Sequence, residues 1–371
     1  MKILVTGGAG LIGSHIADLL LKEGFDVKIL DKLELPTHRN GKPGYISKDI
    51  EFIEGDVTKK ADLFKALEGV KVIFHEAATG GFTPEASKYV INNSLGTAAL
   101  FEAIREKNLP IDKIIVASSV AVYGEGAYSC PEHGVFYPAM RAISQLENRK
   151  WEVACPVCGA DTFSHPTGED KPVSPESVYS VSKYDQERSA LILGKLFRIP
   201  TVALRYFVTF GPRQSIYNPY TGVCSIFATQ ILNDKPPLLF EDGLQTRDFV
   251  FVEDIARANL LVMKQEKADF GVFNVGSGRA ISIRDVAQTL IKKLGKKVSP
   301  LLADEFRPLD VRHIQADISK ISKIGYKPFV TFEKGIDKYL EWIEKQGTIE
   351  DYFSAAREEL KKAGIIRSGN A

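Results

Sequence analysis

A tyrosine and a lysine four positions apart are the residues with the clearest capacity for chemistry. Tyr179 and Lys183 lie in a stretch with helical periodicity, so their side chains share one face of the expected helix. A free phenol has a pKa of about 10 and is a poor base at neutral pH, but a nearby ammonium stabilises the phenolate and lowers that pKa. The pair predicts a tyrosine that removes and returns a proton. An exposed amphipathic helix face is the alternative interpretation.

A hydroxyl group at the end of a strand would complete this constellation. The apolar run 113–117 predicts a buried strand, and Ser118 and Ser119 follow it directly. One of these hydroxyls is expected to assist the tyrosine. The alternative is that both serines only cap the end of the strand.

Three glycines near the start of the chain predict a dinucleotide site. Gly7, Gly10 and Gly13 follow an apolar run and open a helical pattern, which permits a tight turn and brings the backbone close to a pyrophosphate. Asp31 ends the second predicted strand, where a carboxylate accepts hydrogen bonds from the ribose of NAD and repels the 2′-phosphate of NADP. We therefore expect NAD. A turn used for packing alone and a plain strand-end aspartate are the alternatives.

Strands and helices alternate over the first part of the chain. Short apolar runs predict strands at 2–5, 26–30, 51–53, 70–74, 113–117 and 201–205, and helical patterns occupy 12–23, 60–67, 86–107 and 178–196. This alternation predicts the α/β class, with a Rossmann-type doubly wound parallel sheet. We expect an NAD-binding domain over 1–210 and a smaller α/β substrate-binding domain over 211–350, from which about 248–260 and 272–276 return to the first domain. A C-terminal helix and tail are expected over 351–371.

The composition argues against several other classes of protein. The chain has 371 residues and a formal net charge of +1, so no broad electrostatic field attracts it to nucleic acid or to an anionic membrane. Its apolar runs fall short of the roughly 18 residues of a spanning helix, and the apolar start is too short for a signal peptide. We expect a cytoplasmic protein that binds neither nucleic acid nor membrane.

Two short cysteine motifs in the segment 126–172 predict a metal site. Three thiols and one imidazole at this spacing suit a closed, tetrahedral structural zinc site, whose ligands would be Cys130, His133, Cys155 and Cys158. His165 is the main alternative to His133. Free buried cysteines and a redox Cys-x-x-Cys are the other interpretations, although the redox motif usually opens a helix in a thioredoxin-like context. An inserted loop of this size is too small for a core of its own, which favours the metal.

These motifs together resemble those of the extended short-chain dehydrogenase/reductase family, in particular its NAD-dependent nucleotide-sugar epimerases and dehydratases. The glycine spacing, the segments 55–57 and 75–78, and Asn93 correspond to signature segments of that family. The resemblance implies a cofactor site formed by Gly7, Gly10, Leu11, Ile12, Gly13, Asp31, Asp56, Val57, Ala77, Ala78, Asn93, Tyr179, Lys183 and Phe207. In the family's epimerases the catalytic hydroxyl lies four positions before the tyrosine of a Tyr-Gly pair. That register selects Ser119, so the implied catalytic residues are Ser119, Tyr179 and Lys183.

The same resemblance extends to the substrate side. The segment 204–214 is similar to a family segment that often has asparagine where Val208 stands, so that one contact is altered here. Arg247 and Arg307 match two arginines that bind the nucleotide diphosphate, a role that suits the planar, bidentate guanidinium group. The implied substrate-binding residues are Ser119, Tyr179, Val208, Arg247 and Arg307. Surface ion pairs are the alternative for each arginine.

The two residues after the catalytic serine distinguish between reactions. The family's dehydratases carry Asp-Glu at this point, whereas this chain has Val120 and Ala121. The resemblance therefore implies epimerisation at carbon 4 of a nucleotide-diphosphate sugar, through transfer of hydride to NAD and a transient 4-keto sugar. The cysteine insertion is similar to that of a subgroup of bacterial and archaeal enzymes described as dTDP-L-rhamnose 4-epimerases or UDP-glucose 4-epimerase-like, so a UDP- or dTDP-linked sugar is expected.

Other interpretations remain open at this point. A decarboxylase or a net 4-dehydrogenase of the same family would use the same residues, and a non-catalytic NAD-binding scaffold would use the cofactor site alone. Relatives pair the helices that correspond to 86–107 and 178–196, which implies a homodimer. The sequence names neither the nucleotide base nor the sugar.

Overall fold

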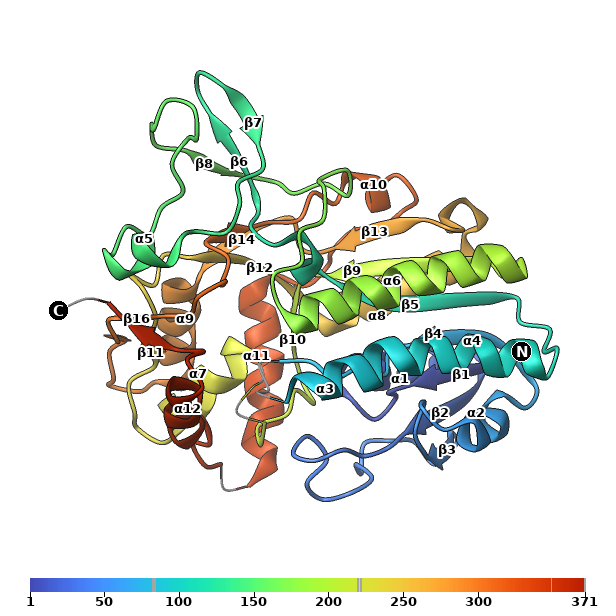
Figure 1. Ribbon diagram of the computed structural model, residues 1–371. Helices are drawn as coiled ribbons and strands as arrows, with labels where there is room; N and C mark the ends of the chain where they lie inside the picture. Colours follow the sequence, from blue (N-terminus) through green and yellow to red (C-terminus); the bar gives the residue numbers. More distant parts are fainter. Residues whose placement is uncertain (82–84, 219, 221, 348, 370–371) are drawn as a thin grey trace.

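The computed structural model of the chain describes residues 1–81, 85–218, 220, 222–347 and 349–369. Its centre is one sheet of seven parallel strands in the order β13-β9-β5-β4-β1-β2-β3 (Figure 1). The strands are β1 (Lys2–Thr6), β2 (Asp26–Asp31), β3 (Glu51–Glu54), β4 (Val70–His75), β5 (Lys113–Ser119), β9 (Thr201–Tyr206) and β13 (Val272–Val275). The predicted doubly wound parallel sheet is confirmed. Its order reverses beside β1, where open α/β sheets bind their ligands.

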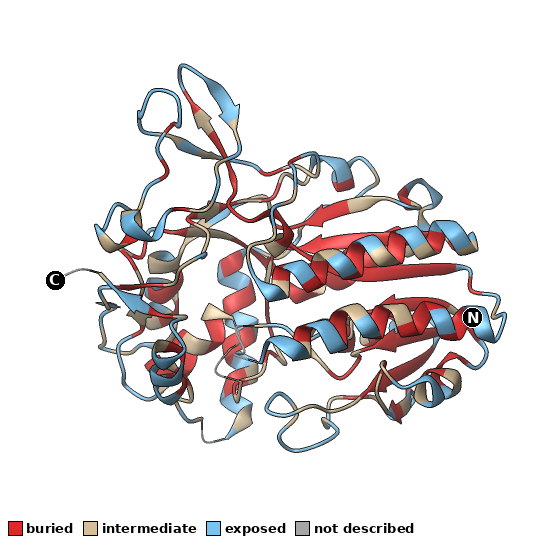
Figure 2. Cartoon of the chain, in the orientation of Figure 1, coloured by how far each residue is buried: buried red, intermediate tan, exposed pale blue. Residues whose placement is uncertain are grey.

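Helices cover both faces of this sheet. One face packs against α1 (Leu11–Lys22) and α8 (Val252–Lys264), and the other against α2 (Lys60–Leu67), α4 (Gly96–Glu106) and α6 (Val178–Phe197). Figure 2 shows the central strands buried and the helices beside them buried mainly on one side, whereas the edge strand β3 is largely exposed. Because parallel strands bury both faces, their sequences are continuous apolar runs, which is why the sequence pattern located them.

The predicted helix 86–107 contains a change of helix type. It begins as α3 (Ala86–Tyr89), continues as a π-helix over Val90–Leu95 and ends as α4. The π-helical turn buries Asn92 and Asn93 together.

A second, smaller sheet lies beyond the carboxyl ends of the large one. It contains β10 (Val208–Phe210), β12 (Thr246–Phe251), β14 (Ala280–Ser282) and β17 (His313–Ile314), and it packs with α7 (Val223–Leu232), α9 (Ile283–Leu294) and α11 (Phe332–Ile343). The segment 248–260, which was expected to return to the first domain, is divided between the two. Residues up to Phe251 belong to the second sheet through β12, and α8 packs against α1. The strand β13, within 272–276, joins the large sheet as expected.

The cysteine-containing insertion forms a protruding sheet of its own, at the top of Figure 1. Its three antiparallel strands are β6 (Ala127–Cys130), β7 (Gly134–Phe136) and β8 (Phe163–His165), and α5 (Ile143–Glu147) follows β7. A 3₁₀ turn over Val120–Tyr123 links it to β5. Further 3₁₀ turns occupy Glu266–Ala268 and Glu344–Gln346.

The tail is shorter in helix than expected. α12 spans Phe353–Lys362, and β18 (Arg367–Ser368) then pairs antiparallel with β16 (Glu305–Phe306). Arg357 and Lys361 of α12 both form ion pairs with Glu305. The remaining short elements are β11 (Leu238–Leu239), β15 (Leu301–Leu302) and α10 (Ser319–Ser322). Among the described helices, none is long and apolar enough to cross a membrane.

Candidate active site

A cavity of about 680 Å³ opens at the carboxyl ends of the large sheet. Residues that directly follow β1, β2, β4, β5 and β9 line it, together with one side of α6 and the loop after β10. From the sequence-predicted site, the cavity brings together Gly7, Gly10, Leu11, Ile12, Gly13, Asp31, Val57, Ala77, Ala78, Ser119, Tyr179, Lys183, Phe207 and Val208. Asp56, Asn93, Arg247 and Arg307 are not among the lining residues.

The glycine turn between β1 and α1 fits a pyrophosphate. Gly7 has a positive φ of 66°, and a Cβ atom there would lie 2.7 Å from the backbone nitrogen of Ala77, so the protein's own packing requires glycine. A Cβ atom on Gly10 would meet only the Gly7 carbonyl oxygen, at 3.4 Å, so the space beside Gly10 is open to a ligand. Gly10 is also the N-cap of α1, without a side-chain cap and without an acidic residue in the first turn. A helix N-terminus in this condition offers N–H groups to an anion.

Asp31 occupies the position expected for a ribose-binding carboxylate. Its Oδ2 accepts a hydrogen bond from the backbone N–H of Ala9 at 2.9 Å, and its Oδ1 accepts one from that of Leu33 at 2.9 Å. These bonds fix the carboxylate at the edge of the cavity, and each oxygen keeps a further lone pair for a ribose hydroxyl. The donor and acceptor groups around the cavity therefore fit NAD.

Ser119 and Tyr179 meet in the cavity. The phenolic hydroxyl of Tyr179 donates to Ser119 Oγ across 3.5 Å. Ser119 Oγ also accepts from the backbone N–H of Ala121, so it caps the 3₁₀ turn as well as facing the tyrosine. The hydroxyl of Ser118 instead donates to Glu187 at 2.6 Å. The contact with Tyr179 supports the choice of Ser119 over Ser118.

Lys183 is buried one helical turn after the tyrosine. Its ammonium donates to the carbonyl of Ala117 and to the side chain of Gln186. Burial lowers the pKa of Lys183 to about 8, opposed by the carboxylates of Glu76 and Glu187. Burial also raises the pKa of Tyr179, opposed by the Ser119 hydrogen bond. In the protein alone the phenol is therefore held neutral, and forming a phenolate there needs further positive charge in the cavity.

Asn93 and Asp56 lie outside the cavity lining and form hydrogen bonds within the segments next to it. Asn93 Oδ1 accepts from the backbone N–H of Thr79 at 2.7 Å, and Nδ2 donates to Ser182 Oγ at 2.9 Å, so this side chain ties the loop after β4 to the catalytic helix. Asp56 accepts two hydrogen bonds from Thr58 within its own turn, and the neighbouring Val57 lines the cavity.

Sequence reasoning passed over several lining residues. Arg213 lines the cavity, donates to Asp18 at 2.6 Å and stacks on the ring of Tyr45 at 4.5 Å. Glu76 also lines it, and accepts from the hydroxyl of Tyr206 at 3.0 Å. Burial raises the pKa of Glu76 to about 7. The signals were present, since Glu76 stands inside the 75–78 motif and Arg213 inside the 204–214 segment.

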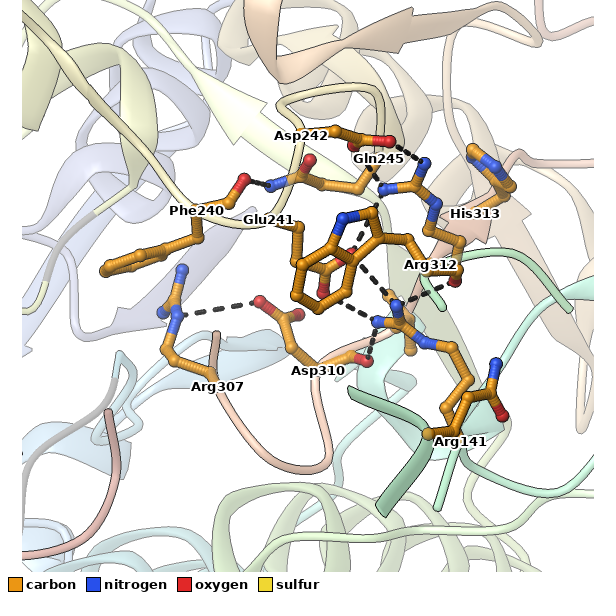
Figure 3. Close-up of polar contacts among 12 residues, drawn as sticks. Arg141, Phe240, Glu241, Asp242, Gln245, Arg307, Asp310, Arg312 and His313 are labelled. Carbon is orange, nitrogen blue, oxygen red and sulfur yellow. Dashed lines mark hydrogen bonds and ion pairs between the residues drawn. The ribbon is translucent and has the colours of Figure 1, made fainter. Parts of the chain in front are cut away.

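The two predicted diphosphate arginines are brought together by one carboxylate. Asp310 Oδ1 accepts from Arg247 at 2.8 Å, and Asp310 Oδ2 lies 3.5 Å from Arg307 Nε. The Arg307 guanidinium lies over the ring of Phe240 at 5.1 Å. Figure 3 shows Arg307 and Asp310 facing each other below the loop that contains Phe240 and Glu241. Both arginines thus lie next to each other, outside the lining of the cavity.

The insertion gathers the four predicted metal ligands. The Sγ atoms of three cysteines and a ring nitrogen of His133 all lie within 4.8 Å of one another. The Sγ atoms of Cys130 and Cys158 are 3.8 Å apart. Thiolates about 2.3 Å from a tetrahedral zinc are separated by about 3.8 Å, so this spacing fits zinc. Backbone N–H groups of Cys158 and Val157 lower the pKa of Cys155 to about 6, which favours the ligating thiolate. His165 lies at the end of β8, outside the cluster.

Fold and cavity together define an NAD-binding α/β enzyme of the short-chain dehydrogenase type. The model of the NAD dependent epimerase/dehydratase family matches residues 3–139 and 153–276. The chain therefore belongs to the NAD-dependent epimerase/dehydratase family. The match is interrupted within the cysteine insertion.

Several proteins similar to this chain are named as 4-epimerases. A dTDP-L-rhamnose 4-epimerase of Burkholderia thailandensis is 33% identical over 93% of this chain and 95% of its own length. A putative UDP-glucose 4-epimerase of Methanocaldococcus jannaschii is 32% identical, over 92% of this chain and 98% of its own. Among solved structures, UDP-glucuronic acid 4-epimerase of Bacillus cereus, with UDP-glucuronic acid and NAD bound, has a TM-score of 0.76 and 31% identity, over 93% of this chain and 99% of its own.

Proposed function

We propose that this protein epimerises a nucleotide-diphosphate sugar at carbon 4, with NAD as a tightly held cofactor, through a transient 4-keto sugar. The observation that carries the proposal is the meeting of Ser119, Tyr179 and Lys183 in the cavity beside the glycine turn. Val120 and Ala121 line the same cavity. They place no acid or base where a dehydratase needs one, which favours epimerisation over loss of water.

The residues have distinct roles in this proposal. NAD, when bound, would accept hydride from carbon 4 and return it to the opposite face. Tyr179, acting as the phenolate, takes the proton from the 4-hydroxyl group and later returns it, and Ser119 holds that hydroxyl in line. Lys183, together with the positive nicotinamide of NAD when bound, would supply the positive charge that stabilises the phenolate.

Inversion requires the 4-keto sugar to turn over between the two hydride transfers. Arg247 and Arg307 are proposed to hold the diphosphate, so that the sugar rotates about a fixed point. Val208, on β10, lines the cavity with an apolar side chain and leaves the turning sugar without a fixed hydrogen bond at that position. A UDP- or dTDP-linked hexose is the proposed substrate.

A panel of UDP-, dTDP- and GDP-linked sugars tests this function. Products are separated and their configuration at carbon 4 is determined. We expect inversion at carbon 4 with at least one UDP- or dTDP-sugar and no net change in NADH absorbance. Steady accumulation of NADH would instead identify a dehydrogenase or decarboxylase. Retention of NAD with no conversion of any sugar would identify a non-catalytic scaffold.

A structural zinc ion and a homodimer complete the proposal. Cys130, His133, Cys155 and Cys158, together the Cys130 cluster, supply a closed ligand set with no position left for a reacting water. The π-helical turn and α6 pack together, and both carry exposed apolar side chains. These are Val90, Ile91 and Leu95 on the turn and Val181, Ile192 and Leu196 on α6. Such a stripe on two adjacent helices suits the same surface of a second copy. A cytoplasmic location stays a prediction.

A further inference from the structure

The segment between β16 and β17 shapes the surroundings of Arg247. Asp310 accepts from Arg247 Nη2 at 2.8 Å, and the carbonyl oxygens of Val311 and Arg312 accept from the same guanidinium at 2.7 and 3.2 Å. Arg307 begins this segment and lies beside Asp310. The positions of both arginines therefore depend on the course of residues 307–312.

Arg141, which lies in the insertion, holds this segment from one side. Its guanidinium makes two parallel hydrogen bonds of 2.9 Å with the carboxylate of Glu241. It also donates to the carbonyl of Asp310 at 3.0 Å and to that of Trp151 at 2.9 Å. Figure 3 shows Arg141 reaching toward Asp310 and Glu241. One buried side chain thus joins the insertion, the loop after β11 and the arginine-bearing segment.

Arg312 holds the same segment at its other end. Its side chain is fully buried, and its guanidinium is bonded to Glu152 of the insertion and to Glu241 and Asp242 of the loop after β11. Its backbone N–H donates to Glu125, just before the insertion, at 2.8 Å. Removing one partner from a buried charge network is costly, so these contacts fix the segment in one position.

We propose that the insertion is a brace that positions the diphosphate-binding arginines, with Arg141 and Arg312 as its positioning residues. The inference rests on the proposed diphosphate role of Arg247 and Arg307. An insertion that served only stability could attach to the body anywhere on its surface. The buried guanidinium of Arg141 instead bonds to Glu241 and to the backbone carbonyl of Asp310, and Glu152 of the insertion pairs with Arg312, so the insertion contacts the segment that follows Arg307 at two points. A guanidinium displaced by about 1 Å no longer presents its charge and N–H groups to a phosphate at hydrogen-bond distance.

The test measures diphosphate binding separately from catalysis. UDP and dTDP are titrated into the full-length protein by calorimetry, and KM and kcat are measured with the best sugar of the panel. Arg141→Lys keeps a charge beside Glu241 but loses the planar fork, and Arg141→Met removes the contacts altogether. Arg149→Ala is the matched control, because Arg149 also lies in the insertion but forms an exposed ion pair with Asp304.

We expect Arg141→Lys to weaken binding of the preferred diphosphate and to raise KM by roughly tenfold, with kcat, bound NAD and circular dichroism close to wild type. Arg141→Met should weaken binding further, and Arg149→Ala should match wild type. Unchanged diphosphate affinity in Arg141→Lys overturns the inference. So does an equal loss of NAD and diphosphate binding with a lower Tm, which would show a merely structural role.

Failure of the proposed reaction would be recognised separately. Calorimetry needs no turnover, so a protein that inverts no sugar but binds UDP or dTDP still shows whether Arg141 positions the arginines. A wild-type protein that binds neither diphosphate would overturn the inference itself.

Discussion

The hydroxyl of Tyr179 lies 3.5 Å from Ser119 Oγ, although the two residues are 60 positions apart in the chain. The insertion leaves the large sheet shortly after Ser119 and returns shortly before α6 begins at Val178. The contact is made between β5 and α6, which pack directly against each other. The two proposed reacting groups therefore lie on a strand end and a helix, as a proton transfer over a hydrogen-bond distance requires.

Replacing Tyr179 with phenylalanine should remove the group that exchanges the proton. We expect the epimerisation rate of Tyr179→Phe to fall by roughly 10²–10⁴-fold, the usual contribution of a general acid–base, with NAD still bound. Tyr184→Phe on the same helix, whose side chain packs against the core, should keep nearly full activity. Initial rates and the NAD content of both proteins provide the check. Near-full activity in Tyr179→Phe would contradict the mechanism.

Removing one thiol of the Cys130 cluster should abolish metal binding. We expect about one zinc per chain in the wild-type protein and none in Cys155→Ala, because three remaining ligands no longer close a tetrahedral site. The Tm should fall by several degrees. Cys224→Ala is the control, since Cys224 is buried in α7 away from the cluster. Plasma mass spectrometry and calorimetry measure both quantities, and a wild-type protein free of metal would refute the zinc proposal.

A charge placed on the exposed apolar stripe should separate the proposed dimer. Val181 is half exposed on α6, so Val181→Lys should leave the fold intact while placing two like charges against each other across an interface between copies. We expect the mass in solution to halve. Leu301→Lys, at a similarly exposed apolar residue of β15, should leave it unchanged. Sedimentation velocity distinguishes these cases, and a wild-type monomer would rule out the dimer.

Acid should destabilise the protein partly through His15 on α1. Burial, together with the charge of Arg213, lowers the pKa of His15 to about 4. The unfolded chain has the higher pKa, of about 6.5, so it binds the proton first and stability falls as the pH drops from about 6.5 to 4. We expect a contribution of about 3 kcal/mol over this window. In urea unfolding, His15→Gln should weaken the pH dependence of the free energy of unfolding. His165→Gln, at an exposed position, should leave that pH dependence unchanged. If the free energy of unfolding of His15→Gln falls with decreasing pH as steeply as that of the wild type, the prediction is contradicted.

Local patterns were sufficient to locate the strands, the glycine turn and the catalytic helix. Strand β5 and helix α6 are each specified by their own periodicity, which predicts a serine at the end of the strand near Tyr179, and the family resemblance then selected Ser119 over Ser118. The metal ligands were accessible for the same reason, because their spacing within two short motifs is itself the signal.

Features that depend on contacts between residues far apart in the chain could not be predicted from local sequence patterns. Arg312 and Glu152 are far apart in the chain, and nothing near either residue indicates that the buried Arg312 forms an ion pair with the exposed Glu152. The π-helical turn at Val90–Leu95 was also missed, since its apolar residues fit an ordinary helical period. A helix followed by a tail was expected over 351–371, but nothing in the local pattern indicated that Arg367 and Ser368 would pair with β16.

The clamp between the tail and β16 bears on how the protein should be handled. Glu305 is held by Arg357 and Lys361, and Glu305 is only two residues before Arg307. A purification tag or fusion partner joined at the carboxyl end would therefore lie next to the contacts that hold β16, the strand that leads into the proposed diphosphate site. Met1 is exposed and precedes the end of β1 that faces away from the cavity. An amino-terminal tag is the safer choice for measuring nucleotide affinity.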